Sequence, residues 1–197
     1  MFKINFNDNF CVNYDKSLLI VVDMIKGFTD IGSLKSEFIK SICKDIKNAS
    51  KKFSHIVSIN DSHKKHDCEF NNFPTHCIEG SCECEMCDEL KDVKFTHTLF
   101  KNSTNGFFSK NFMDVFKYYI DNNFDFVVVG CCTDICILQF CITFKTYLNF
   151  INKNLNIIVP KNLVETYDCE NHVRDKVTNA SLYLMSNAGI VLINSLL

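Results

Sequence analysis

Asp23, Asp61, Lys101 and the segment 130–136 share one feature: each directly follows a short apolar run. If the apolar runs are neighbouring parallel strands, these polar residues meet at one edge of a sheet, where such folds bind ligands. Strands must also end in something polar, so the coincidence alone proves no site. Whether these residues form a functional site therefore depends on the motifs in which each of them stands.

Cys136 has the most reactive setting of these residues. It ends the motif Gly130–Cys136 (GCCTDIC) and lies in the first turn of a helical pattern over 134–150. In the first turn of a helix, unpaired N–H groups and the helix dipole stabilise a thiolate. The same N–H groups can hold the oxyanion that forms when a thiolate attacks a carbonyl. On spacing alone, a buried core thiol like Cys141 is an equal alternative.

A second constellation has the composition of a metal site. Asp61 and His63 stand two apart in DSH and point to the same side of an extended segment. Glu69 follows, and a proline turn places His76 downstream. One carboxylate and two imidazoles, completed by a second carboxylate or water, suit zinc, manganese or iron(II).

The twelve cysteines admit another interpretation. Cys77, Cys82, Cys84 and Cys87 have spacing that could hold a structural zinc or an iron–sulfur cluster, although the segment also reads as a short acidic helix. Cysteines inside apolar segments behave as small hydrophobes. With no export signal visible at residues 1–16, we expect reduced thiols and a cytoplasmic protein.

Predicted strands and helices alternate along the chain and carry these residues at their ends. Apolar runs predict strands at 18–22, 55–59, 93–99, 126–129, 155–159 and 190–193. Helical stripes lie at 33–52, 109–120, 134–150 and 171–188. Strands apolar on both faces and separated by helices indicate a parallel sheet covered on both sides. The long polar stretch 62–90 is expected to be functional.

Composition limits the function classes further. The formal net charge of −2 argues against a nucleic-acid partner, and no apolar run approaches the roughly 20 residues that span a bilayer. We expect one domain over 1–197, in which residues 1–16 form an arm or hairpin. The sequence is compatible with a homo-oligomer and does not indicate the oligomeric state. His55, His97, Asp168 and His172 are interpreted as structural, the last two as capping or first-turn residues of the last helix.

Five motifs, taken in order, resemble the isochorismatase-like cysteine hydrolases, and among these the nicotinamidases. They are LLIVVDMIKGF (18–28), DSH (61–63), FPTHCIEGS (73–81), LFKNSTNGFF (99–108) and GCCTDIC (130–136). The resemblance covers about 18–193. It implies a three-layer α/β/α fold with a six-stranded, mostly parallel sheet in the Rossmann-like order 3-2-1-4-5-6.

The resemblance also implies roles for individual residues. Asp23 would be the triad acid/base, Lys101 its cation and Cys136 the nucleophile. The backbone of Cys132 and Cys136 would form the oxyanion hole, with a cis peptide between Cys131 and Cys132. The implied ligands of one divalent ion, zinc first, are Asp61, His63, His76 and, seven residues before His76, Glu69; His66 competes for the fourth place.

For the substrate, the resemblance implies an aromatic clamp of Phe28 and Phe73. Two departures concern the pocket wall: Ser103 and Thr104 replace an aromatic common after the triad lysine, and Phe73 stands where Trp is common. The implied reaction is hydrolysis of a small amide, nicotinamide first, in NAD salvage. The alternatives are a carbamoyl or ureido hydrolase of the same family and a non-enzymatic thiol- or metal-binding protein.

Overall fold

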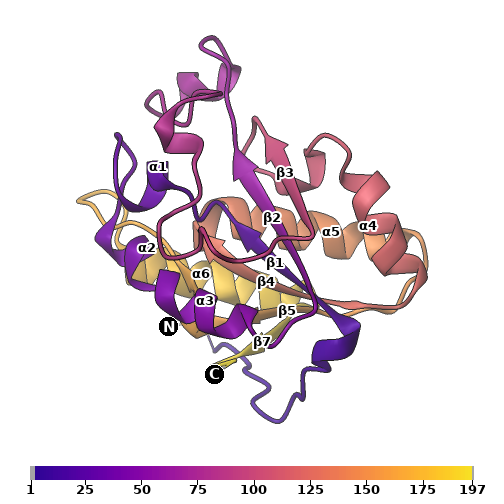
Figure 1. Cartoon of the computed structure of the whole chain (residues 1–197). Helices are drawn as coiled ribbons and strands as arrows, with labels where there is room; N and C mark the ends of the chain where they lie inside the picture. Colours follow the sequence, from indigo (N-terminus) through magenta and orange to yellow (C-terminus); the bar gives the residue numbers. More distant parts are fainter. Residues whose placement is uncertain (1–2, 197) are drawn as a thin grey trace.

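A seven-stranded sheet forms the centre of the molecule in the computed structural model, which describes residues 3–196 (Figure 1). The strand order is β3-β2-β1-β4-β5-β7, with β6 paired to β4, and every pairing is parallel. The predicted order is therefore confirmed, with a short additional strand. The strands are β1 (Ser17–Val22), β2 (His55–Asp61), β3 (His97–Lys101), β4 (Asp125–Cys131), β5 (Ile157–Pro160), β6 (Val164–Glu165) and β7 (Val191–Ile193).

Helices cover both faces, as expected for strands that are apolar on both sides. Alternate residues of β1 belong to opposite cores, because side chains alternate along a strand. Leu18 and Ile20 pack with α4 (Phe112–Asp121), α5 (Leu138–Phe150) and α6 (Arg174–Asn187). Leu19 and Val21 pack with α2 (Glu37–Ser41) and α3 (Cys43–Ser50) on the other face, where α1 (Lys26–Thr29) also lies (Figure 1).

Two sequence predictions need correction. The helix predicted at 33–52 is two helices, because the backbone departs from regular helix at Ile42, between α2 and α3. The strand predicted at 93–99 begins only at His97 and includes Lys101. Residues 1–16 were expected to form an arm or hairpin, and their described part contains no strand: Asn7 donates its N–H to the Leu192 carbonyl, and Asp8 binds Asn194.

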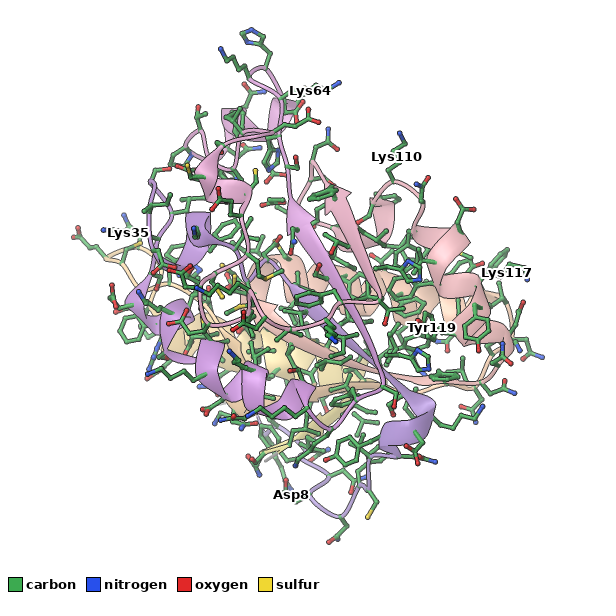
Figure 2. All side chains as sticks on the ribbon, in the orientation of Figure 1. Asp8, Lys35, Lys64, Lys110, Lys117 and Tyr119 are labelled. Carbon is green, nitrogen blue, oxygen red and sulfur yellow. The ribbon has the colours of Figure 1, made fainter. Side chains whose placement is uncertain are left out.

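Charged side chains are spread over the surface. Lys64, Lys110 and Lys117 project outward from separate elements in Figure 2, and all three are exposed. None of the helices within residues 3–196 is long and apolar enough to cross a membrane.

The strand register brings the polar residues together. In the β2–β3 pair, Asp61 lies directly opposite Lys101. In the β1–β2 pair, Val22 lies opposite Ile59, and the next residue, Asp23, donates its N–H to the Ile59 carbonyl at 2.9 Å. The ends of three neighbouring strands therefore deliver Asp23, Asp61 and Lys101 to one edge.

We expect Gly130→Ala to destabilise the fold strongly. Gly130 has φ +116°, and an added Cβ would lie 2.1 Å from the Val22 carbonyl oxygen on the neighbouring strand. Because backbone cannot move aside cheaply, the free energy of unfolding should fall by about 3 kcal/mol or more. Urea denaturation of the purified variants measures this change.

Gly80→Ala is the matched control. Gly80 also has a positive φ, +78°, but open space surrounds the position of an added Cβ. Only the backbone cost of about 1 kcal/mol is expected there. Equal losses in the two variants would show that the contact between β1 and β4 is not the constraint.

Candidate active site

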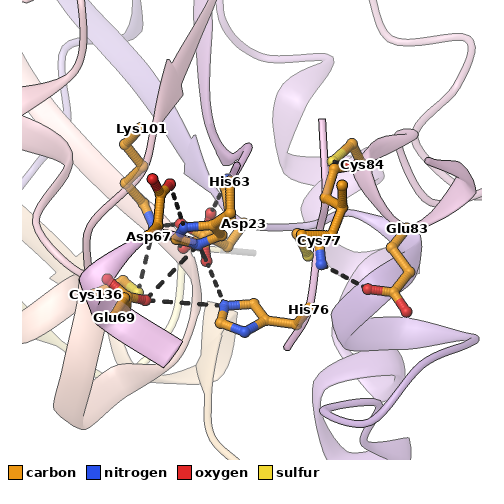
Figure 3. A network of polar contacts seen from close by, with 12 residues as sticks. Asp23, His63, Asp67, Glu69, His76, Cys77, Glu83, Cys84, Lys101 and Cys136 are labelled. Atoms are coloured by element: carbon orange, nitrogen blue, oxygen red, sulfur yellow. Dashed lines mark hydrogen bonds and ion pairs between the residues drawn. The ribbon is translucent and has the colours of Figure 1, made fainter. Parts of the chain in front are cut away.

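Lys101 lies at the centre of a buried cluster of charges. Its Nζ is 2.8 Å from Asp23 Oδ2, forms a second ion pair with Asp61 Oδ1, and is 3.6 Å from Cys136 Sγ (Figure 3). The side chain of Lys101 is fully buried, as is that of Asp23. Lys101 thus contacts both of the other residues that the resemblance assigned to a triad.

These contacts control the charges of the cluster. Burial raises the pKa of Asp23 to about 6, with a further upward push from Asp61, against the opposing effect of Lys101. Burial acts to lower the pKa of Lys101, but the two carboxylates hold it well above its usual value. Burial raises the pKa of the Cys136 thiol, which the Lys101 ammonium opposes. The Lys101 ammonium therefore favours the ionised forms of both Asp23 and Cys136.

The backbone at the end of β1 fixes the Asp23 carboxylate. Asp23 has φ 55°, a left-handed conformation that is uncommon for a residue other than glycine. Its Oδ1 accepts the Asp61 N–H at 2.8 Å, and the Cys131 thiol donates to its carbonyl oxygen at 3.3 Å. The strained residue is thus held from both neighbouring strands, β2 and β4.

Cys136 lies on a tight turn between β4 and α5. A cis peptide joins Cys131 and Cys132, as the resemblance implied, and residues Thr133–Ile137 form a π-helical turn. Cys136 is 6% exposed and lines a cavity, whereas Cys141 is fully buried in the core. Of the two thiols compared in the sequence, only Cys136 can meet a ligand.

Four ligand atoms converge beside this cluster. They belong to Asp61, His63, Glu69 and His76 and lie within 4.8 Å of one another. The Nε2 atoms of His63 and His76 are 3.6 and 3.4 Å from Asp61 Oδ2, and 3.8 and 3.9 Å from Glu69 Oε1. These separations approach the roughly 3.4 Å edge of a tetrahedron with zinc–ligand bonds of about 2.1 Å.

Three observations show that the donor set fits a divalent cation. His63 is fully buried, and neither ring nitrogen has a hydrogen-bond partner. His76 Nδ1 lies 2.7 Å from the Pro74 carbonyl oxygen, which only accepts, so Nδ1 carries the hydrogen and Nε2 presents its lone pair. Around Lys101, three carboxylates against one ammonium also leave two excess negative charges, which a divalent ion would neutralise.

The other proposed metal ligands lie elsewhere. His66 is exposed and outside the convergent group. Cys77, Cys82, Cys84 and Cys87 do not converge anywhere in residues 3–196, which disfavours the four-cysteine alternative; Cys82–Cys84 form a short 3-10 helix instead. Cys87 instead faces Cys43 on α3, with their Sγ atoms 3.7 Å apart, and Cys84 donates to the Ile78 carbonyl. The described cysteines are free thiols.

A cavity of about 650 Å³ opens at this edge of the sheet. Cys136, the metal-ligating candidates Asp61, Glu69 and His76, and both residues of the predicted clamp line it. Phe28 is nearly buried against the His76 ring, with centroids 5.8 Å apart, and Phe73 lies 6.5 Å from the same ring. The cavity thus joins the thiol, the clamp and the candidate metal centre.

Sequence reasoning missed several residues of the site. Asp67 Oδ2 lies 3.5 Å from His63 Nδ1, and Phe70 packs on His63 with centroids 5.1 Å apart. Tyr167 lines the cavity from the segment after β6, a strand too short to leave a periodic signal. Asp168 behaves as interpreted, since its Oδ1 accepts the N–H of Arg174 at the start of α6.

The family model described as the Isochorismatase domain matches residues 17–188. The chain belongs to the isochorismatase family. It is 28% identical over 203 residues to Nicotinamidase 1 of Arabidopsis thaliana, covering 91% of this chain and 83% of that protein. The isochorismatase-family chain is therefore a nicotinamidase-like hydrolase, and a non-enzymatic role is set aside.

Solved structures of other proteins have the same fold as this chain. PnC1 from L. infantum in complex with nicotinate has a TM-score of 0.78 at 19% identity, over 92% of this chain and 94% of that one. A pyrazinamidase of Pyrococcus horikoshii in complex with zinc scores 0.72 at 18% identity, over 90% and 98%. N-carbamoylsarcosine amidase from Thermoplasma acidophilum scores 0.68 at 23% identity, over 90% and 95%. At these identities the likeness establishes the shared fold.

We expect Glu69→Ala to weaken binding of a divalent ion about 10-fold or more, because it removes one of four converging ligand atoms. His66→Ala is the control, and its affinity should equal that of the wild type. Calorimetric titration of the metal-free protein with zinc measures the affinities of both variants. Reversed effects in the two variants would assign the fourth ligand to His66.

Proposed function

We propose that this hydrolase converts nicotinamide and water to nicotinate and ammonia through a thioester on Cys136, as a step of NAD salvage. The observation that carries the proposal is the position of Lys101 Nζ, 2.8 Å from Asp23 and 3.6 Å from Cys136 Sγ, beside a cavity lined by three of the four convergent side chains that could ligate a metal. The curated relative named as a nicotinamidase supports the choice of substrate.

Asp23 is the proton carrier in this mechanism. Its carboxyl group interacts with the Cys136 side chain, and its pKa of about 6 suits a group that accepts and returns a proton near neutral pH. Asp23 takes the thiol proton, and the Lys101 ammonium stabilises the thiolate that remains. Lys101 itself stays charged, because both carboxylates raise its pKa.

The thiolate sulfur then attacks the amide carbonyl carbon. The negative charge that develops on oxygen is held by the backbone N–H groups of Cys132 and Cys136. Asp23 returns its proton to the amide nitrogen, the C–N bond breaks, and ammonia leaves a thioester on Cys136. Water, deprotonated by Asp23, attacks that thioester and releases nicotinate and the thiol.

The remaining residues of the cavity bind and orient the substrate. Phe28 and Phe73 provide apolar surface for a flat ring. Asp61, His63, Glu69 and His76 would hold the divalent ion, zinc first with manganese or iron as alternatives. When bound, such an ion supplies a Lewis acid to which a ring nitrogen can bind. A carbamoyl substrate offers no such atom, which favours nicotinamide over the carbamoyl alternative.

Cys136→Ala should abolish ammonia release from nicotinamide, with a loss of at least about 10³-fold in kcat, because no other group can form the thioester. The free energy of unfolding should change by less than about 1 kcal/mol, since the thiol borders a cavity. A coupled ammonia assay and urea denaturation measure the two quantities.

Cys141→Ala is the matched control, because Cys141 is a fully buried thiol on α5 that does not line the cavity. It should lose stability but retain kcat. Turnover by Cys136→Ala at the wild-type rate would refute the nucleophile. A panel with nicotinamide, N-carbamoylsarcosine and an aliphatic amide tests the substrate: faster turnover of the carbamoyl compound would refute nicotinamidase activity.

A further inference from the structure

Tyr167 forms part of the cavity wall but comes from a segment with no assigned role. It follows β6, whose two residues pair with Gly130 and Cys131 at the end of β4. Tyr167 lines the same cavity as Phe28, Phe73 and Cys136. The side of the cavity that follows Lys101 contributes Thr104 in place of an aromatic side chain.

The ring of Tyr167 is supported from behind. His172 stacks on it face to face, with centroids 3.8 Å apart and ring planes 10° apart. Tyr167 lines the cavity, whereas the His172 ring behind it does not. A ring whose rear face is covered in this way is held in one orientation before a ligand arrives, which lowers the entropic cost of binding.

His172 is itself fixed at both ring nitrogens. Its Nδ1 donates to the Tyr167 carbonyl oxygen at 3.1 Å, and its Nε2 lies 2.8 Å from Asp134 Oδ2. Two backbone hydrogen bonds between Cys169 and His172 close the turn that carries the ring. The sequence indicated a capping or first-turn role for His172, but α6 begins at Arg174 with Val173 as its N-cap.

Asp134 connects this wall to the nucleophile. It stands two residues before Cys136 on the π-helical turn, and its Oδ1 accepts from the buried Thr166 hydroxyl at 2.6 Å. One carboxylate thus holds both ends of the segment 166–172. Any shift of the wall relative to the turn of Cys136 would break one of these hydrogen bonds.

We propose that Tyr167 is a specificity-determining residue that contacts the ring of an aromatic amide, and that His172 is a positioning residue that acts through Tyr167. The inference rests on the proposed function, because it concerns the same cavity. It assigns the preference for a flat aromatic substrate over an aliphatic amide to a stacked pair that is itself fixed to the nucleophile's turn by Asp134.

Steady-state ammonia release from nicotinamide tests the proposal in Tyr167→Leu, His172→Leu and the double variant. Each single variant should raise KM about 10-fold while kcat stays within about threefold, because ring contact is lost but the triad is intact. The double variant should be no worse than Tyr167→Leu alone, since His172 acts only through that ring. Phe150→Leu, at an aromatic residue 84% exposed at the end of α5, should match the wild type.

A wild-type KM in Tyr167→Leu, or losses that multiply in the double variant, would overturn the assignment. If His172→Leu does not fold, Thr166→Val replaces it in the cycle, with KM expected to rise and the same lack of additivity. Calorimetric titration of nicotinamide into Cys136→Ala, with and without Tyr167→Leu, should show the same 10-fold loss of affinity.

Failure of the two proposals is distinguishable. If the wild type releases no ammonia from nicotinamide and Cys136→Ala does not bind it, the proposed function fails and this inference fails with it. If the wild type hydrolyses nicotinamide and Tyr167→Leu retains its KM, only the role of Tyr167 is wrong.

Discussion

The burial of the Lys101 ammonium between two carboxylates is the interaction on which the rest of the site depends. A lone ammonium without solvent would be strongly unfavourable, so Lys101 is tolerated only with Asp23 and Asp61 in contact. Its partners lie at the ends of two adjacent strands, β1 and β2, and Lys101 ends β3. The parallel register of these strands is therefore an electrostatic requirement as well as a packing one.

Asp61 makes the candidate triad and the candidate metal centre a single unit. Its Oδ1 pairs with Lys101, and its Oδ2 faces the Nε2 atoms of His63 and His76. A cation beside Oδ2 would withdraw charge from the carboxylate that neighbours Asp23. Binding of a metal ion and the proton affinity of Asp23 would consequently be coupled through one side chain.

The sequence predicted the parts of this arrangement that depend on short-range pattern. The apolar runs before Asp23, Asp61 and Gly130 located the strand ends, and parallel topology then implied one shared edge. The resemblance placed the fourth ligand at Glu69 with His66 as a competitor; the structure brings only Glu69 to the convergent group. The family itself was evident from the order of the motifs.

The parts that sequence could not predict depend on contacts distant in the chain. Ile42 interrupts a helical stripe without glycine or proline to mark the break. The four-cysteine spacing suggested a cluster, yet Cys87 packs against Cys43, 44 residues earlier. Tyr167 gains its place in the cavity from hydrogen bonds between Asp134 and the segment 166–172, which leave no periodic signal.

In the proposed mechanism one sulfur among twelve, that of Cys136, becomes covalently bound to the substrate's acyl group. This thioester can be trapped by acid quenching of the enzyme during turnover of nicotinamide and located by proteolysis and mass spectrometry. We expect a nicotinoyl group on the peptide that contains Cys136, attached at that residue. An acyl group on Cys132 or another cysteine, or an unmodified enzyme under conditions that trap thioesters, would contradict this mechanism.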